Sequence, residues 1–239
     1  MALFNSAKAQ AAADNLVVIN LKKGKSEDQC KCIDFFYLPD EPAKKGCLGG
    51  KSSAWTIDDY CAHVDRIVNG LNLKARAIAK IGLDESQISE IAPICLTTFL
   101  RGENIRRKYN ADYTKFVSNQ FSVTWIFFSA TQLYTHTYIF DTMSDNSWEY
   151  TRDFFYSDIT CIRTEHEVEE VIHENVSTKG CGCTKKAEAK YTHHNIHWDT
   201  LQITVPNDSY SFCCRTHDVE GIEQSIQAAK AMIREKKQA

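Results

Sequence analysis

The sequence predicts an α+β protein in which short helices come first, followed by an antiparallel sheet of about seven strands and one C-terminal helix. Three changes of pattern along the chain predict this order. Apolar residues recur at helical spacing from Thr56, alternate at every second position from Lys115, and form one helical stripe again from about Asp218. These changes divide the 239 residues into segments 1–53, 54–112 and 113–239.

The first segment, residues 1–53, is the least regular part of the chain. We predict a short strand over residues 32–38, and the prolines and glycines after it indicate a loop. The stretch GCLGGKSS at residues 46–53 invites comparison with a phosphate-binding loop, but that motif needs a glycine where Lys45 stands. We therefore expect a plain glycine-rich turn.

The second segment, residues 54–112, has the pattern of short helices. Thr56 followed by Asp59 resembles a helix start, and an apolar stripe follows it. Such short helices are marginal alone and must pack on one another or on the next segment. The remaining predicted elements are two short helices, over residues 73–81 and 84–91, and a polar, basic linker over residues 101–113.

The third segment, residues 113–239, has the alternation of antiparallel strands. Its clearest feature is a long hairpin around a short loop at residues 129–131. The helix from about Asp218 has one apolar face, which needs a sheet to cover, and its charges suit the helix dipole. The other predicted strands cover residues 149–155, 159–164, 168–176, part of 187–205, and 209–215.

The composition is that of an ordinary globular protein. It is 43% hydrophobic and 25% charged with a net charge of −3, which excludes a disordered, collagen-like or rod-like chain. The near-neutral charge provides no basic field, so we expect no nucleic-acid binding. Residues 1–20 lack the pattern of a secretion signal, and the most apolar stretch, residues 121–130, is too short to span a membrane. We therefore expect a cytoplasmic protein without a transmembrane segment.

The order of strands and helix in the third segment resembles the pleckstrin-homology (PH) and GRAM superfold. The stretch FFYSDITCI at residues 154–162 is similar to bacterial variants of that fold, in which an aromatic residue precedes an Asp-Ile corner. The whole chain also resembles a group of uncharacterised bacterial proteins with segments like KIGLDESQISEI and FSVTWIFFSATQLYTHTYIFD. The resemblance implies a PH/GRAM-like domain over residues 113–239, a seven-stranded sandwich or barrel capped by the C-terminal helix.

The resemblance also implies binding at an open end or along a strand edge of that domain. Phosphoinositide-binding members carry basic residues in their first hairpin loop, whereas the loop at residues 129–131 has no Lys or Arg. A phospholipid is therefore a weakly supported ligand, and a protein partner is favoured. The leading hypothesis is a non-enzymatic cytoplasmic binding or scaffold protein. Exposed aromatic residues such as Tyr134 and Trp148, or the edge strands, would form its contact surface.

Cysteine and histidine clusters lead to an alternative hypothesis, a zinc-stabilised regulatory or sensor protein. The chain has ten cysteines, four of them in two Cys-x-Cys pairs, and thiolates with imidazoles suit structural zinc. If residues 191–198 form a strand, His193 and His197 share one face and His194 lies on the other. Exposed thiols or small buried side chains are the competing interpretation, and we expect no other cofactor. The candidate ligands are Cys181, Cys183, His193 and His197, and separately Cys30, Cys32 and Cys47.

A third hypothesis is an enzyme whose site lies between the two halves of the chain. The sequence has no Gly-x-Ser-x-Gly motif, and it does not place a cysteine beside a histidine. No catalytic residue can therefore be named from the sequence. A pocket at the junction lined by convergent polar groups would favour this hypothesis.

Overall fold

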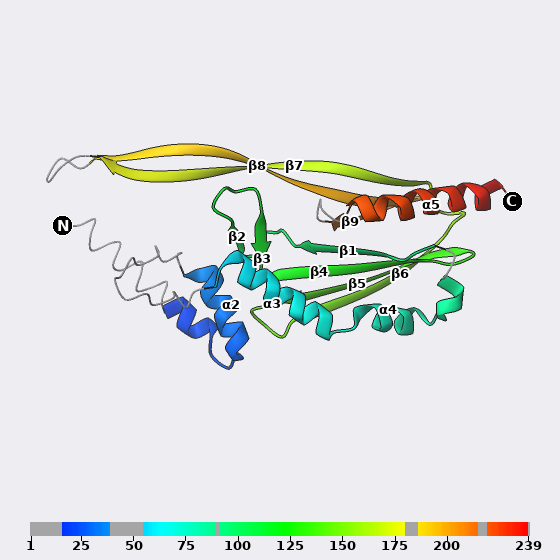
Figure 1. Cartoon of the computed structure of the whole chain (residues 1–239), viewed down its shortest axis with the longest axis horizontal. Helices are drawn as coiled ribbons and strands as arrows, with labels where there is room; N and C mark the ends of the chain where they lie inside the picture. The colour runs from blue at the N-terminus through cyan, green and yellow to red at the C-terminus, as the bar shows by residue number, and fades with distance from the viewer. Residues whose placement is uncertain (1–15, 39–54, 89–90, 180–185, 215–218, 239) are drawn as a thin grey trace.

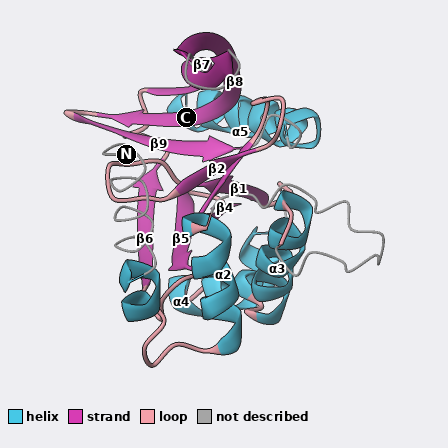
Figure 2. Ribbon diagram, turned by 90° about the vertical axis from the view of Figure 1, so that its left-hand side faces the viewer, coloured by secondary structure: helices cyan, strands magenta, loops and turns pink. Residues whose placement is uncertain are grey.

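The computed structural model describes residues 16–38, 55–88, 91–179, 186–214 and 219–238, and it has three layers (Figure 1). A four-stranded sheet lies in the middle. Helices α2 (Glu27–Tyr37), α3 (Ile57–Gly70) and α4 (Leu73–Ile81) cover one face of this sheet. A three-stranded sheet and helix α5 (Val219–Gln238) cover part of the other face. Figure 2 shows α2, α3 and α4 on one side of the strands and α5 on the opposite side.

Side-chain caps define where the N-terminal helices begin. Thr56 and Asp59 form a capping box at the start of α3, which confirms the predicted helix start. Helix α4 ends at Gly82, whose φ of 75° is accessible to glycine without strain. Within the predicted third helix, residues 89–90 lie outside the described residues, and the described part contains the 3₁₀ turn η1 (Glu85–Ile88) in place of an α-helix.

The strand predicted over residues 32–38 is wrong, because these residues belong to helix α2. Ser26 and Gln29 form a capping box before the helix, and Leu38 is its C-cap. Cys32, Ile33 and Phe35 are buried, which is a helical spacing and not the alternation of a strand. The apolar and aromatic composition of this stretch suits both structures, and packing against α3 decides for the helix.

The central sheet has the order β1-β4-β5-β6, and all its neighbours are antiparallel. The predicted hairpin is confirmed as β4 and β5, and the predicted strand over residues 149–155 is confirmed within β6. Strand β1 comes from the segment predicted to be helical, so the sheet begins before residue 113. The strands are β1 (Ile94–Phe99), β4 (Gln120–Phe128), β5 (Gln132–Asp141) and β6 (Ser147–Phe155).

A small hairpin leaves the central sheet between β1 and β4. It consists of β2 (Arg107–Tyr109) and β3 (Phe116–Ser118), paired antiparallel. Part of the predicted linker over residues 101–113 is therefore a strand, and the predicted boundary between residues 112 and 113 falls inside the loop of this hairpin.

The third sheet has the order β7-β8-β9 and contains a very long hairpin. Strand β7 (Cys161–Lys179) pairs with β8 (Lys186–Val205) over its whole length. Strand β9 (Asp208–Cys214) pairs only with the C-terminal end of β8, residues 199–205. The strands predicted over residues 159–164 and 168–176 are therefore one continuous strand. Beyond β9 the β7–β8 hairpin extends across the β2–β3 hairpin (Figure 1).

Two main cores hold the layers together. Tyr60, Val64 and Val123 belong to the core between the helices and the central sheet. Ile126, Ile203 and Ile226 belong to the core between the two larger sheets and α5. The described strands form ladders of four, two and three strands, and none of these ladders closes into a barrel. The α+β class is confirmed, and the barrel form of the prediction is wrong.

Among the described residues, none of the helices has the length and apolar character that a membrane-spanning segment needs.

Candidate functional site

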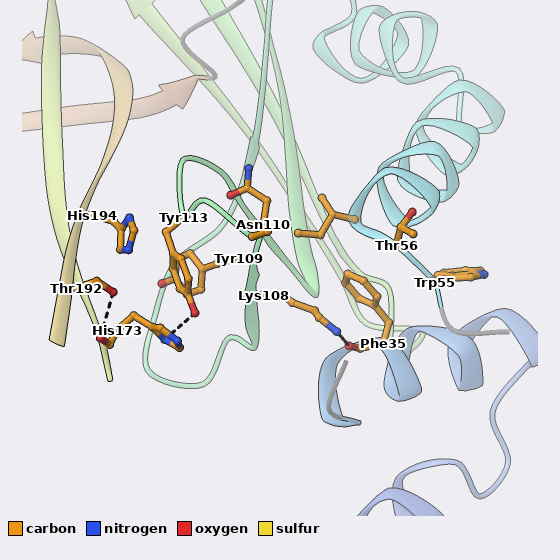
Figure 3. Close-up of a pocket in the computed structure, with 12 residues that line it drawn as sticks. Phe35, Trp55, Thr56, Lys108, Tyr109, Asn110, Tyr113, His173, Thr192 and His194 are labelled. Atoms are coloured by element: carbon orange, nitrogen blue, oxygen red, sulfur yellow. Dashed lines mark hydrogen bonds between the residues drawn. The ribbon is translucent and has the colours of Figure 1, made fainter. Parts of the chain in front are cut away.

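A cleft of about 620 Å³ lies where α2, the start of α3 and the β2–β3 and β7–β8 hairpins meet (Figure 3). It therefore lies between the N-terminal helices and the long β-hairpin of the C-terminal segment. Aromatic and polar side chains both contribute to its walls. The lining residues are Phe35, Trp55, Thr56, Ile57, Lys108, Tyr109, Asn110, Ala111, Tyr113, His173, Thr192 and His194.

A tight loop between β2 and β3 places Tyr113 in one wall of the cleft. The backbone N–H of Tyr113 donates to the carbonyl oxygen of Asn110, and Asn110 Oδ1 accepts from the N–H of Lys115 at 2.9 Å. The φ of Tyr113 is 56°, in the left-handed region that an aromatic residue rarely adopts. Such strain persists only where surrounding contacts impose it, and it is concentrated at functional sites.

Tyr113 reaches the β7–β8 hairpin and joins two of its histidines. The Tyr113 hydroxyl lies 2.6 Å from Nδ1 of His173, and its ring stacks on His194 with ring centroids 4.7 Å apart. On the other side Tyr109 stacks on Tyr113 at 5.6 Å. Burial raises the pKa of Tyr109 above its ordinary value. Figure 3 shows these side chains together along one wall.

The opposite wall belongs to α2 and the start of α3. Lys108 crosses toward it, where its Nζ donates to the carbonyl oxygen of Phe35 at 3.0 Å and lies 4.6 Å from the Phe35 ring. Phe35 stacks on Tyr60 with ring centroids 4.8 Å apart, and Trp55 lies 5.0 Å from the His63 ring. The wall therefore presents aromatic surface that is anchored in the helical core.

Arginines of the predicted linker connect the two hairpins next to the cleft. Arg107 and Arg101 lie 3.2 Å and 3.8 Å from the Glu169 carboxylate of β7. The Arg101 guanidinium also lies 3.3 Å from the centroid of the Trp198 ring on β8, and Arg106 lies 4.6 Å from the Tyr37 ring. These basic side chains therefore bind groups of the chain itself, on the β7–β8 hairpin and on α2.

The candidate zinc ligands of the first segment do not come together in the described residues. Cys30 and Cys32 are two positions apart on α2, about 200° around the helix, so they leave it on different sides. Cys32 is fully buried, and its burial raises the pKa of its thiol to about 12. Cys30 is half-buried, with Sγ 3.9 Å from the carbonyl oxygen of Lys22. Cys47, Cys181 and Cys183 lie outside the described residues.

His193 and His197 share one face of β8, and His194 lies on the other face against Tyr113, as predicted. Four residues along a strand separate His193 from His197 by about 13 Å, too far for one metal ion. His193 Nδ1 lies 2.7 Å from Glu170, and His197 Nδ1 lies 3.0 Å from His166. In the described ranges, no group of three or more His, Cys, Asp or Glu is arranged to hold a metal ion.

Tyr134 and Trp148, the predicted contact residues, lie on opposite faces of the central sheet. Trp148 pairs with Ile139, and Tyr134 lies five positions before Ile139 on β5, an odd separation that sets Tyr134 on the other face. Tyr134 is half-buried on the helix side, and its hydroxyl donates to Gln132 Oε1. Trp148 is 39% exposed on the edge strand β6. The two residues therefore do not form one surface.

The cleft residues were not predicted from the sequence. Tyr109 and Tyr113 stand in the basic segment predicted to be a linker, and His173 has no notable neighbours along the chain. The available signal was the pair of tyrosines in the stretch RRKYNADY, because a solvated linker has no need of aromatic residues.

Comparisons of the chain with family models, curated proteins and solved structures found no match.

Proposed function

We propose that the protein is a non-enzymatic binding or scaffold protein that recognises a protein partner at the cleft. The observation that carries this proposal is the aromatic lining, with Phe35, Trp55, Tyr109 and Tyr113 converging from three elements. Buried aromatic residues contribute most of the binding energy at many protein interfaces. Lys108 and Tyr113 already hydrogen-bond neighbours in the chain, which favours a binding role over a catalytic one.

We further infer that the two larger sheets and α5 form a PH/GRAM-like domain. Strands β1, β4, β5 and β6 are successive antiparallel neighbours once the β2–β3 hairpin is set aside, and β7, β8 and β9 form a second meander. Helix α5 follows the last strand and packs between the sheets. Four strands, three strands and a helix is the order that the resemblance implies, with β1 as its first strand.

This arrangement changes which loop bears on lipid binding. The first connection of the sheet runs from β1 to β4 and carries Arg101, Arg106, Arg107 and Lys108, whereas residues 129–131 form the second. These basic side chains contact Glu169, Trp198, Tyr37 and Phe35. Their contacts support a protein partner over a phospholipid. A reducing cytoplasm suits the proposal, because Cys30, Cys32, Cys161 and Cys213 are thiols outside any disulfide.

The test compares cleft variants with a control variant in partner capture. The full chain is immobilised and exposed to a cell extract with cross-linking, and the cross-linked sites are mapped by mass spectrometry. We expect cross-links from residues near the cleft to one protein. Purified, that protein should bind the Tyr109→Ala and Trp55→Ala variants at least about tenfold more weakly than the wild type. The Phe155→Ala control, at an exposed aromatic residue of β6 away from the cleft, should bind as the wild type does.

Other outcomes would reject the proposal. Equal affinity of all variants would place the partner elsewhere, and binding to anionic vesicles without any protein partner would favour the lipid. The zinc alternative has its own test, the metal content of the chain purified without chelator. A metal ratio near one that disappears in Cys181→Ser would favour that alternative, and a ratio near zero removes it. Turnover of a small molecule, abolished by His173→Ala, would favour an enzyme at the same cleft.

A further inference from the structure

Strand β6 forms an open edge of the central sheet. It pairs with β5 on one side, and no described strand pairs with its other side. Natural edge strands are protected from pairing with another chain by shortness, bulges, proline and charged side chains, lysine above all. The nine residues SWEYTRDFF of β6 contain no lysine, proline or glycine, and their register with β5 is unbroken. This edge therefore lacks a bulge, a proline and a lysine, and its three charged residues, Glu149, Arg152 and Asp153, limit the registers in which it can pair.

The hydrogen bonds at the two ends of β6 show which backbone groups face outward. Asp141 N–H donates to the carbonyl of Asn146 at 3.0 Å, and Tyr156 N–H donates to the carbonyl of Thr131 at 3.2 Å. In an antiparallel ladder, hydrogen-bonded pairs alternate with non-hydrogen-bonded pairs. The even-numbered residues of β6 therefore bond to β5. The backbone groups of Ser147, Glu149, Thr151 and Asp153 point to the open edge.

We propose that β6 pairs with β6 of a second copy of this chain, antiparallel and with the two-fold axis at Tyr150. The odd-numbered residues of one copy must pair with odd-numbered residues of the other, because only these have outward backbone groups. The two-fold axis must therefore pass through a residue of the strand and not between two residues. An axis at Thr151 sets Glu149 opposite Asp153 of the second copy. An axis at Glu149 sets Glu149 of one copy opposite Glu149 of the other. Both place negative charges together, which destabilises cross-strand pairs.

The axis at Tyr150 gives complementary pairs instead. Arg152 then lies opposite Trp148 of the second copy, and Glu149 lies opposite Thr151. Trp148 and Tyr150 are 39% and 44% exposed on the same face, so their rings are available to a neighbour. Arg152 already lies 4.8 Å from the Tyr210 ring on that face. Two symmetry-related contacts between arginine and tryptophan and about eight backbone hydrogen bonds would hold the dimer.

The first experiment measures the dimer by sedimentation of the full chain over a range of concentrations. Thr151→Pro removes one outward N–H from each copy, whereas Thr151→Ala keeps it. We expect the wild type and Thr151→Ala to dimerise and Thr151→Pro to dimerise about thirtyfold more weakly. A wild type that is monomeric at all concentrations overturns the proposal. The proposal is also overturned if the dimer survives Thr151→Pro but is lost in Ile172→Lys, because Ile172 is an exposed residue of β7 and not of β6.

The second experiment tests the register and needs no change to the backbone. Tyr150 of each copy would form a non-hydrogen-bonded pair on the axis, with Cβ atoms about 5 Å apart. Tyr150→Cys should therefore form a disulfide-linked dimer under mild oxidation, and Thr151→Cys and the wild type should not. Cross-linking of Thr151→Cys in preference to Tyr150→Cys overturns the proposed register. This test decides the proposal even if Thr151→Pro fails to fold.

Discussion

The hydroxyl oxygen of Tyr113 lies 2.6 Å from Nδ1 of His173, which joins the β2–β3 loop to strand β7 across 60 residues of sequence. The two rings are also in contact, with centroids 4.5 Å apart. Tyr113 holds a left-handed backbone conformation at this point. The contacts to the hairpin therefore maintain a strained loop, and one wall of the cleft is already formed before any partner binds.

Tyr113→Phe should loosen the β7–β8 hairpin. The substitution keeps the ring stack but removes the hydroxyl, so one partly buried hydrogen bond worth about 1 kcal/mol is lost. We expect the backbone amides of residues 190–198 to exchange with deuterium about fivefold faster, because local opening becomes easier. Tyr150→Phe, on the exposed edge strand, is the control. Unchanged exchange in Tyr113→Phe would show that the hydroxyl does not hold the hairpin.

Glu149→Gln should destabilise the whole fold. Both carboxylate oxygens of Glu149 accept hydrogen bonds from Arg76 at 2.8 Å, and Lys80 and the buried His136 lie within 2.7 Å. The Glu149 side chain is only 12% exposed, so losing its charge leaves cations of α4 without their partner. We expect the free energy of unfolding in urea to fall by about 2–4 kcal/mol. Asp153→Asn, on the same strand and exposed, should change it by less than about 0.5 kcal/mol.

The same carboxylate should make stability depend on pH. Hydrogen bonds from Arg76, then from Lys80 and His136, hold the pKa of Glu149 well below its ordinary value of 4.5. A depressed folded-state pKa contributes stability that is complete above the unfolded value and is lost as the pH falls through the folded value. Below pH 4.5 the wild type should therefore lose stability more steeply than Glu149→Gln. Parallel stability profiles of the two proteins would contradict this role.

Cys32 should be inert to alkylation in the folded protein. Its pKa is raised to about 12, first by burial, so the thiolate that reacts is almost absent at neutral pH. Cys161 is exposed. We expect iodoacetamide to modify Cys161 at least about a hundredfold faster than Cys32, as read by peptide mass mapping. The difference should disappear in denaturant, and comparable rates without denaturant would mean that α2 opens readily.

Tyr60→Phe should weaken the core between the helices and the central sheet. The Tyr60 hydroxyl donates to the carbonyl of Ser118 at 2.7 Å and lies 2.8 Å from Oγ1 of Thr142. Both partners are buried, so removing the hydroxyl leaves them partly unsatisfied. We expect a loss of about 1–2 kcal/mol in the free energy of unfolding. Tyr150→Phe is the matched control, and an equal effect of both substitutions would contradict the role of the buried hydroxyl.

Elements whose pattern is local were predicted from the sequence, and elements that depend on distant partners were not. The start of α3 follows from Thr56 and Asp59, which cap their own helix. Strand β1 could not be predicted, because its six residues are stabilised by pairing with β4, more than twenty positions later. Residues 32–38 were assigned to the wrong structure because aromatic and apolar residues suit a strand and a buried helix equally.

The cleft shows the same division. Alternation along β8 correctly predicted that His194 faces away from His193 and His197. It did not predict that Tyr113 would meet His194, because this contact joins two segments that lie about eighty residues apart in the sequence. The cysteine and histidine spacings drew attention to metal binding, yet the described members of those clusters lie on different sides of a helix or far apart on a strand.

The sequence by itself determined the α+β class, the central hairpin and the amphipathic C-terminal helix, because the spacing of apolar residues along each of these segments predicts its secondary structure and its buried face. Only the tertiary structure decided that β1 completes the central sheet, that the β7–β8 hairpin extends over the β2–β3 hairpin, and that the cleft forms between them. The physical reason is that these features depend on contacts between segments that are far apart in the chain, and the local pattern of residues does not indicate which distant segments will be in contact.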